Sequence, residues 1–171
     1  MADNPYMTPK AELVERPEHG IQCFERFSTW YVLGLTIITL SIYYIVWLYR
    51  RTQILNQLTP NKIGDRFIQV TLLLFSISLL VSVGEVVLEP SPTYVLVSDS
   101  LGYLSGIFEL VWVFKFRNRL VDDVLEGEDT RSEVGPILTF FFQIFYLQYK
   151  INQQLDKLQA ADRTRSDPGN I

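Results

Sequence analysis

The chain has only one cysteine, Cys23, and one histidine, His19, among its 171 residues. A single cysteine excludes a disulfide within the chain and a zinc site built from several cysteines. A single histidine leaves little material for a histidine-based metal centre or a catalytic triad. Basic charge is not in excess either, because 15 Lys and Arg stand against 19 Asp and Glu. We therefore expect no metal, no cofactor and no nucleic-acid partner.

Sequence motifs that carry known chemistry are also missing. The chain has no phosphate-binding glycine loop, nucleophile elbow, zinc motif or haem motif. The expectation is therefore a protein that is not an enzyme.

Long runs without charge are the dominant feature of the sequence. Residues 27–49 contain no Asp, Glu, Lys or Arg, and a helix of these 23 residues measures about 34 Å. That length crosses a bilayer core of about 30 Å. Three further apolar segments follow at residues 67–88, 94–116 and 134–149, the last of them short for a crossing. We predict an all-α, polytopic helical membrane protein with three to four membrane helices, some of them short or re-entrant, and amphipathic cytoplasmic extensions.

The remaining segments are polar. Residues 1–26 are predicted to be an acidic N-terminal tail, residues 27–158 the helical membrane domain, and residues 159–171 a disordered C-terminal tail. The prolines within residues 89–93 predict a tight turn, so that segments 67–88 and 94–116 form a helical hairpin.

A weak internal repeat relates three parts of the chain. Residues 37–58 align without a gap with residues 137–158, and six of 22 positions are identical. Residues 110–120 resemble residues 45–55 in the same way. One explanation of this match is shared apolar composition. The other is a repeated structural role, in which each copy is an apolar helix followed along the chain by aromatic residues, then basic residues, then an amphipathic segment. In the last copy Ile151, Leu155 and Leu158 form a stripe suited to the membrane surface or to a partner helix.

The distribution of basic residues bears on topology. Four crossings leave Lys and Arg almost equally divided between the two sides, which is unusual for a membrane protein. If the fourth segment does not cross, the division becomes 12 against 3. If the first segment also re-enters, all 15 lie on one side and only residues 89–93 face the other. The three-span and re-entrant alternatives both stay open, and so does the four-span alternative, because the counts are small.

The strings TLSIYYIVWLYR (residues 39–50) and ILTFFFQIFYLQYKIN (residues 137–152) resemble a family of small bacterial membrane proteins classed as a domain of unknown function. The resemblance covers roughly residues 24–158. Its usual signature is T-L-G-I-Y followed by aromatic residues and a basic exit, and Ser41 stands where the family often has glycine. The resemblance implies a helical architecture in the bacterial inner membrane, with no known catalytic residues.

Three acidic residues are candidates for an intramembrane polar site. Glu109 lies well inside an apolar segment, where a carboxylate is costly unless it is protonated, paired or hydrated. It is interpreted either as a proton or cation site or as a structural hydrogen-bonding group. Glu85 and Asp99 flank the predicted turn, where they either share a proton or cation or are hydrated near the headgroups.

Small residues predict where the helices of the hairpin meet. Gly102 and Gly106 form a GxxxG motif, which lets two helices approach closely. Small polar residues continue this face on both segments of the hairpin. The candidate packing positions are Ser98, Gly102, Gly106, Ser78 and Ser82. They serve either the hairpin itself or a homodimer.

Two functions fit this sequence. The first is a non-enzymatic adaptor, scaffold or accessory subunit of the cell membrane, acting through contacts with a membrane-protein partner or a second copy. The second is a small oligomeric transport or channel component that uses Glu109.

Overall fold

The computed structural model describes residues 20–88, 91–125 and 134–166, and within these ranges it contains helices and no strand. The all-helical fold class is confirmed. The described ranges contain five α-helices, a short 3₁₀ helix, η1, and a π-helical turn, η2. Their bounds are η1 Ile21–Cys23, α1 Thr29–Ile38, α2 Ile42–Leu58, α3 Asp65–Val87, α4 Pro92–Arg119, η2 Leu120–Val124 and α6 Pro136–Ser166. Most of the predicted acidic tail and the chain end after residue 166 lie outside the described residues.

The first uncharged run is two helices and not one. Leu40 and Ser41 adopt positive φ angles of 49° and 69°, which end α1 and start α2 in a new direction. The Thr39 hydroxyl donates to the Leu35 carbonyl at 2.7 Å and accepts from the Tyr43 amide at 2.9 Å, so it stabilises both helix ends. Ser41 occupies the left-handed region that glycine adopts without strain. A single continuous helix over residues 27–49, which the crossing alternative requires, is therefore not formed, whereas the re-entrant alternative agrees with the break.

The residues that precede and follow this first run lie close to each other. One guanidinium nitrogen of Arg51, Nη2, donates to the backbone carbonyl of Glu25 at 2.8 Å. The Asn152 amide of α6 donates to the Phe27 carbonyl at 2.7 Å. Residues 25 and 51 flank the run on either side, and Phe27 is its first residue. The apolar segment therefore leaves the polar part of the molecule and returns to it.

The fourth apolar segment is broken as well. Gln143, inside α6, has φ 41° and ψ −121°, which is outside the helical region. The Gly135 amide donates to the Tyr146 hydroxyl at 3.1 Å, so the chain folds back on itself between these residues. Arg117, near the end of α4, donates to the Val134 carbonyl at 3.0 Å. The segment over residues 134–149 is thus a short helix, a break and the start of a long helix.

The predicted hairpin is formed by α3 and α4, which pack against each other along their length. These are also the helices long and apolar enough to cross a membrane, α4 being continuous with η2: Asp65–Val87 and Pro92–Val124. A count of three to four crossing helices is not confirmed, because within the described residues two helices meet that description. Tyr94 fixes the closed end of the hairpin through its hydroxyl, which donates to the Val81 carbonyl at 2.9 Å.

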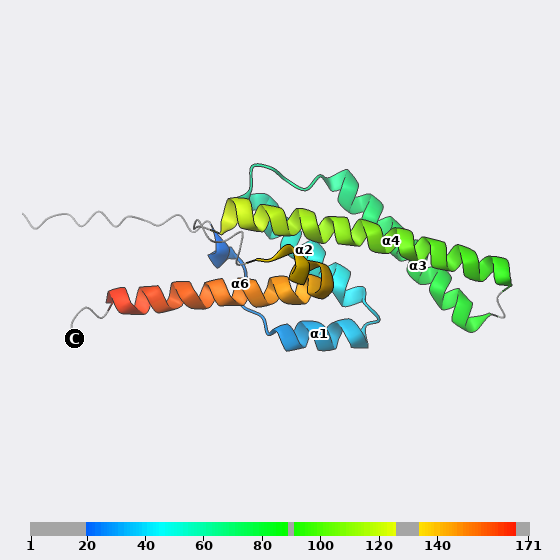
Figure 1. Ribbon diagram of the computed structural model, residues 1–171, viewed down its shortest axis with the longest axis horizontal. Coiled ribbons are helices and arrows are strands. Elements are labelled where there is room, and N and C mark those ends of the chain that lie inside the picture. The colour runs from blue at the N-terminus through cyan, green and yellow to red at the C-terminus, as the bar shows by residue number, and fades with distance from the viewer. Residues whose placement is uncertain (1–19, 89–90, 126–133, 167–171) are drawn as a thin grey trace, which may run out of the picture.

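Helices α2, α4 and α6 contact one another and run in the same direction, while α3 runs the opposite way (Figure 1). These three parallel helices are the three copies of the sequence repeat. The α1–α2 turn and the start of α6 lie on the side toward which the hairpin of α3 and α4 projects (Figure 1). The polar ends of the three helices lie on the opposite side.

The repeat has a physical basis in burial. Positions separated by 100 residues in α2 and α6 are buried alike, and α4 buries the equivalent positions. The buried positions that the copies share are Tyr44, Trp47, Leu48, Arg51 and Leu55 in α2; Trp112, Val113, Phe116 and Leu120 in α4 and η2, where the equivalent of Tyr44 is the half-buried Glu109; and Ile144, Leu147, Gln148, Ile151 and Leu155 in α6. Each copy supplies the same inward stripe to a common core.

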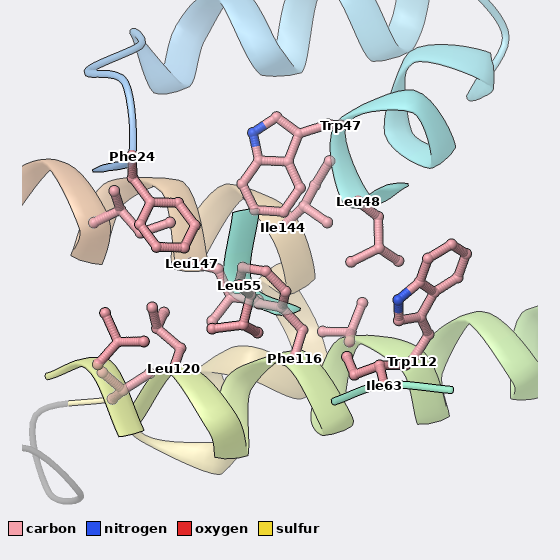
Figure 2. Packing of buried hydrophobic residues seen from close by; sticks show 14 of the residues in the cluster. Phe24, Trp47, Leu48, Leu55, Ile63, Trp112, Phe116, Leu120, Ile144 and Leu147 are labelled. Carbon is pink, nitrogen blue, oxygen red and sulfur yellow. The ribbon is translucent and has the colours of Figure 1, made fainter. Parts of the chain in front are cut away.

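The core is dominated by large side chains that converge from the three parallel helices (Figure 2). Trp112 and Phe116 are fully buried, and Phe116 contacts the Trp47 ring with centroids 5.9 Å apart. The Trp112 indole nitrogen donates to the Thr52 hydroxyl at 3.0 Å. Phe24, just after η1, closes the core from the N-terminal side and meets Phe116 edge to face at 6.4 Å.

Exposed apolar side chains are concentrated away from this core. Trp30 of α1 is 80% exposed and Leu80 of α3 is 72% exposed. The first turns of α6 also expose large apolar groups, including Ile137 and Phe141. The apolar surface therefore covers the projecting hairpin, α1 and the start of α6.

Candidate functional site where the helix breaks meet

Glu109 is half-buried on the inward face of α4, one turn before Trp112. The Ser105 hydroxyl, one turn earlier, donates to a carboxylate oxygen of Glu109 at 2.8 Å. Ser105 itself is buried. The carboxylate therefore has a fixed hydrogen-bond partner on its own helix, inside a predominantly apolar segment.

Two residues from the other broken segments complete a polar cluster beside Glu109. The Tyr44 hydroxyl of α2 donates to the side-chain oxygen of Gln143, the residue at the break in α6. Glu109 is close enough to Tyr44 to act electrostatically on its phenol. Three helices are thus connected by Ser105, Glu109, Tyr44 and Gln143. The connection lies close to the break before α2 and at the break within α6.

Sequence reasoning identified Glu109 and missed Tyr44 and Gln143. A signal was present, because the register that pairs Trp112 with Trp47 also pairs Glu109 with Tyr44. Tyr44 and Glu109 are polar residues at equivalent positions of two repeat copies, which indicates that they lie at the same height in the helix bundle. The break at Gln143 has no such signal, since it depends on how the chain folds back.

A second polar network ties the N-terminal segment to the bundle. Gln148 is buried in α6, and its side-chain oxygen accepts from the Trp47 indole at 2.9 Å while its amide donates to Asn152 at 2.9 Å. Arg51 approaches the same Gln148 oxygen at 3.5 Å. Burial lowers the pKa of the Arg51 guanidinium, and the nearby Glu25 carboxylate opposes that change. The guanidinium stays charged, because arginine does not deprotonate in proteins.

Glu85 and Asp99 lie near the closed end of the hairpin. Glu85 is half-buried and Asp99 is exposed, and neither has a hydrogen bond or ion pair to another described residue. The structure places Glu109 with Tyr44 and Gln143, and it gives Glu85 and Asp99 no such partners among the described helices.

The small residues divide between the hairpin interface and the surface. Ser78 and Ser98 are buried, and a Cβ added to Gly102 would come within 3.9 Å of the Ser78 hydroxyl. These positions lie where α3 meets α4. Ser82 is exposed and a Cβ at Gly106 would meet nothing within 4 Å, so neither contributes to close packing within the described part of the chain.

The apolar stripe of the last repeat does not form a free contact surface. Ile151 is fully buried and Leu155 nearly so, and Leu158 packs against the same core. The stripe lies where α6 meets η1 and the residues that follow it. The sequence interpretation as a membrane-surface or partner face is wrong for these residues, because the N-terminal segment covers them.

The fold defines an all-helical protein in which two helices are long and apolar enough to span a membrane, which indicates membrane association. Residues 27–122 match the family described as a domain of unknown function, DUF4234. This match covers more than half of the chain, and the chain belongs to that family. No curated protein and no solved structure matches the chain.

Proposed function

We propose that the chain is an integral protein of the bacterial cell membrane in which α3 and α4 cross the bilayer as a hairpin. In this arrangement α1 with the start of α2, and the start of α6, are re-entrant segments that enter and leave through the same leaflet. The contact between Arg51 and the Glu25 carbonyl is the observation that carries the proposal. A helix that crosses cannot have its two flanking residues in contact.

The charge distribution supports the same topology. With two re-entrant segments, all 15 Lys and Arg lie on one side, which is the arrangement that the positive-inside rule favours for the cytoplasm. From the turn at Leu40 and Ser41 to Arg50, α2 spans about 14 Å, roughly half of the bilayer core. That depth suits a segment that dips and returns.

We further propose that the protein is not an enzyme and acts through contacts, as an adaptor, scaffold or accessory subunit. The support is the concentration of polar helix ends at one membrane surface. Arg119, at the end of α4, donates to the backbone carbonyl of Asn61, and Asn56 bonds the Ile63 backbone at 2.8 and 3.0 Å. These bonds hold the loop between α2 and α3 against α4. They make a rigid face that a partner protein can recognise.

Site-specific photocrosslinking in intact membranes tests this role. A crosslinker at the exposed positions Gln57, Asn61 or Asn118 is expected to give adducts of discrete mass. The matched lipid-facing positions Leu80 and Leu96 are expected to give none. An adduct at twice the chain mass identifies a second copy as the partner. If no discrete adduct forms from any of the three polar positions, the contact role is wrong.

The cluster around Glu109 supports a second candidate function, a transport or channel component. Transporters use broken helices near the membrane midplane to expose polar groups to an ion, and here a carboxylate lies beside two such breaks. In this function an oligomer of the chain moves protons or a cation past Glu109.

Ion flux into proteoliposomes separates the two functions. Glu109→Gln is expected to abolish a proton- or cation-dependent flux, while the control Glu85→Gln keeps it. Equal flux for the wild type, both variants and empty liposomes would eliminate the transport function and leave the contact role untouched.

A further inference from the structure

A groove of about 480 Å³ lies between the N-terminal segment and α2. Cys23, Glu25 and Phe27 form one wall, and residues of α2 form the other. The groove combines two kinds of surface. Arg50 and Arg51 border it toward the polar end of the helix, and Tyr43 and Val46 border it toward the apolar turn.

The two arginines give this groove a net positive charge, and neither forms an ion pair with a described carboxylate. Arg50 is exposed and has no partner among the described residues. Arg51 is buried, and its Nη2 nitrogen donates to the Glu25 carbonyl and Gln148, both neutral acceptors. No fully buried side-chain nitrogen among the described residues lacks a hydrogen bond, so Nε and Nη1 of Arg51, which make none, are not fully buried, and Arg51 lines the groove. The guanidinium is therefore held in place while part of its donor capacity stays free.

The level of the groove relative to the bilayer follows from the proposed topology. The apolar turn at Leu40 and Ser41 lies about 14 Å beyond Arg50 along α2. Tyr49, on the groove wall beside Arg50, is an exposed aromatic group of the kind found at the headgroup boundary, and Val46, one turn closer to the apolar turn, is exposed and apolar. The basic end of the groove thus lies at phosphate level and the aromatic end at acyl-chain level.

We propose that this groove binds one anionic glycerophospholipid, with its phosphate at Arg50 and Arg51 and an acyl chain along Tyr43 and Val46. The inference rests on the proposed membrane topology. Arginine forms directed hydrogen bonds with phosphate oxygens. The Glu25 carboxylate on the opposite wall reduces the net charge of the site to that of one cation. This balance fits a monoanionic phosphodiester, and Glu25 can accept a hydrogen bond from the hydroxyls of a glycerol headgroup.

Native mass spectrometry after release from mixed bilayers tests the site. The bilayers contain phosphatidylglycerol and phosphatidylcholine in equal parts. The wild type is expected to retain one phosphatidylglycerol, and Arg50→Gln to weaken retention about fivefold, the effect of one basic group at the headgroups. Val46→Trp, which fills the apolar part of the groove and keeps its charge, is expected to weaken retention as well.

Arg66→Gln is the matched control, because Arg66 is an exposed arginine at the start of α3 and has no partner among the described residues. It removes the same charge from a different surface and is expected to leave retention unchanged. Equal losses for the Arg50 and Arg66 variants would show general attraction to the surface and would overturn the proposal. Displacement of the lipid by millimolar inorganic phosphate would identify a simple anion site and would overturn it too.

The only cysteine of the chain gives an independent measurement. Cys23 is exposed on the groove wall, so a bound lipid is expected to slow its reaction with a polar maleimide. Slower labelling in micelles supplied with phosphatidylglycerol than in micelles supplied with phosphatidylcholine supports the proposal. Identical rates contradict it. Because the measurement is made in micelles, its result does not depend on the number of crossings.

Discussion

Residues 27–49 and α3 are both long apolar segments, but they fold differently. The first has no charged residue at all and breaks into two helices at Leu40 and Ser41. Helix α3 begins with Asp65 and Arg66, includes Glu85, and is continuous over 23 residues. The difference lies in what the ends contact. The residues that flank the first run bond to each other, whereas the last turns of α3 bond to the next helix through Val81 and Tyr94. Uncharged length alone therefore does not decide which segment forms one continuous helix.

The same contrast separates the two halves of α4. Its second half carries Trp112 and Phe116 in a core built by three helices, while its first half packs on α3 through small residues such as Ser98. Side-chain burial in the core stabilises the second half, and in the proposed topology the bilayer surrounds the first half. Substitutions in the two halves should therefore have very different costs.

Trp112→Ala is expected to have the largest effect. It removes a fully buried indole and its bond to Thr52, and such truncations cost about 3–5 kcal/mol. The measurement is the unfolding free energy in detergent micelles, followed by helical circular dichroism. Leu80→Ala, on the exposed face of α3, serves as the control and should cost less than about 0.5 kcal/mol. Similar costs at both positions would contradict the distinction between core and hairpin.

Gln148→Leu is expected to have the next largest effect. The substitution preserves volume but leaves the Trp47 indole without its acceptor, and an unsatisfied buried donor costs about 2 kcal/mol. Unfolding monitored by tryptophan fluorescence measures it. The same change at the exposed Gln69 of α3 should be near neutral. A neutral Gln148→Leu would mean that this network does not hold α2 and α6 together.

Ser41→Gly is expected to stabilise the protein by about 0.5–1 kcal/mol. Ser41 has a φ of 69°, where a Cβ is strained and glycine is not. The same change at Ser76, inside α3, should instead cost about 0.5 kcal/mol, because glycine is a poorer helix former than serine. Thermal unfolding midpoints of the two variants give the comparison. A loss of stability at both positions would mean that the turn at residues 39–41 is not formed.

The sequence allowed the all-helical class and the α3–α4 hairpin to be predicted, because these depend on local composition, and it indicated Glu109 as a candidate. Turn prolines and uncharged length are readable along a single segment. The breaks at Ser41 and Gln143 were not predicted, since their backbone angles depend on contacts between distant segments. Burial of Ile151 and Leu155 was missed for the same reason. An amphipathic stripe indicates that a face will be covered, and it does not say whether the cover is lipid, a partner or the chain's own N-terminal segment.

Cysteine accessibility across the membrane tests the central claim, that the first uncharged run enters and leaves on one side. Single cysteines are introduced by Ser28→Cys, Gln57→Cys and Ser91→Cys in a Cys23→Ser background, all at exposed positions. A membrane-impermeant maleimide should label the first two from one side only and the third, in the hairpin turn, from the other. Labelling of Ser28→Cys from the same side as Ser91→Cys, with Gln57→Cys on the opposite side, would show that the run crosses and would contradict the proposed topology.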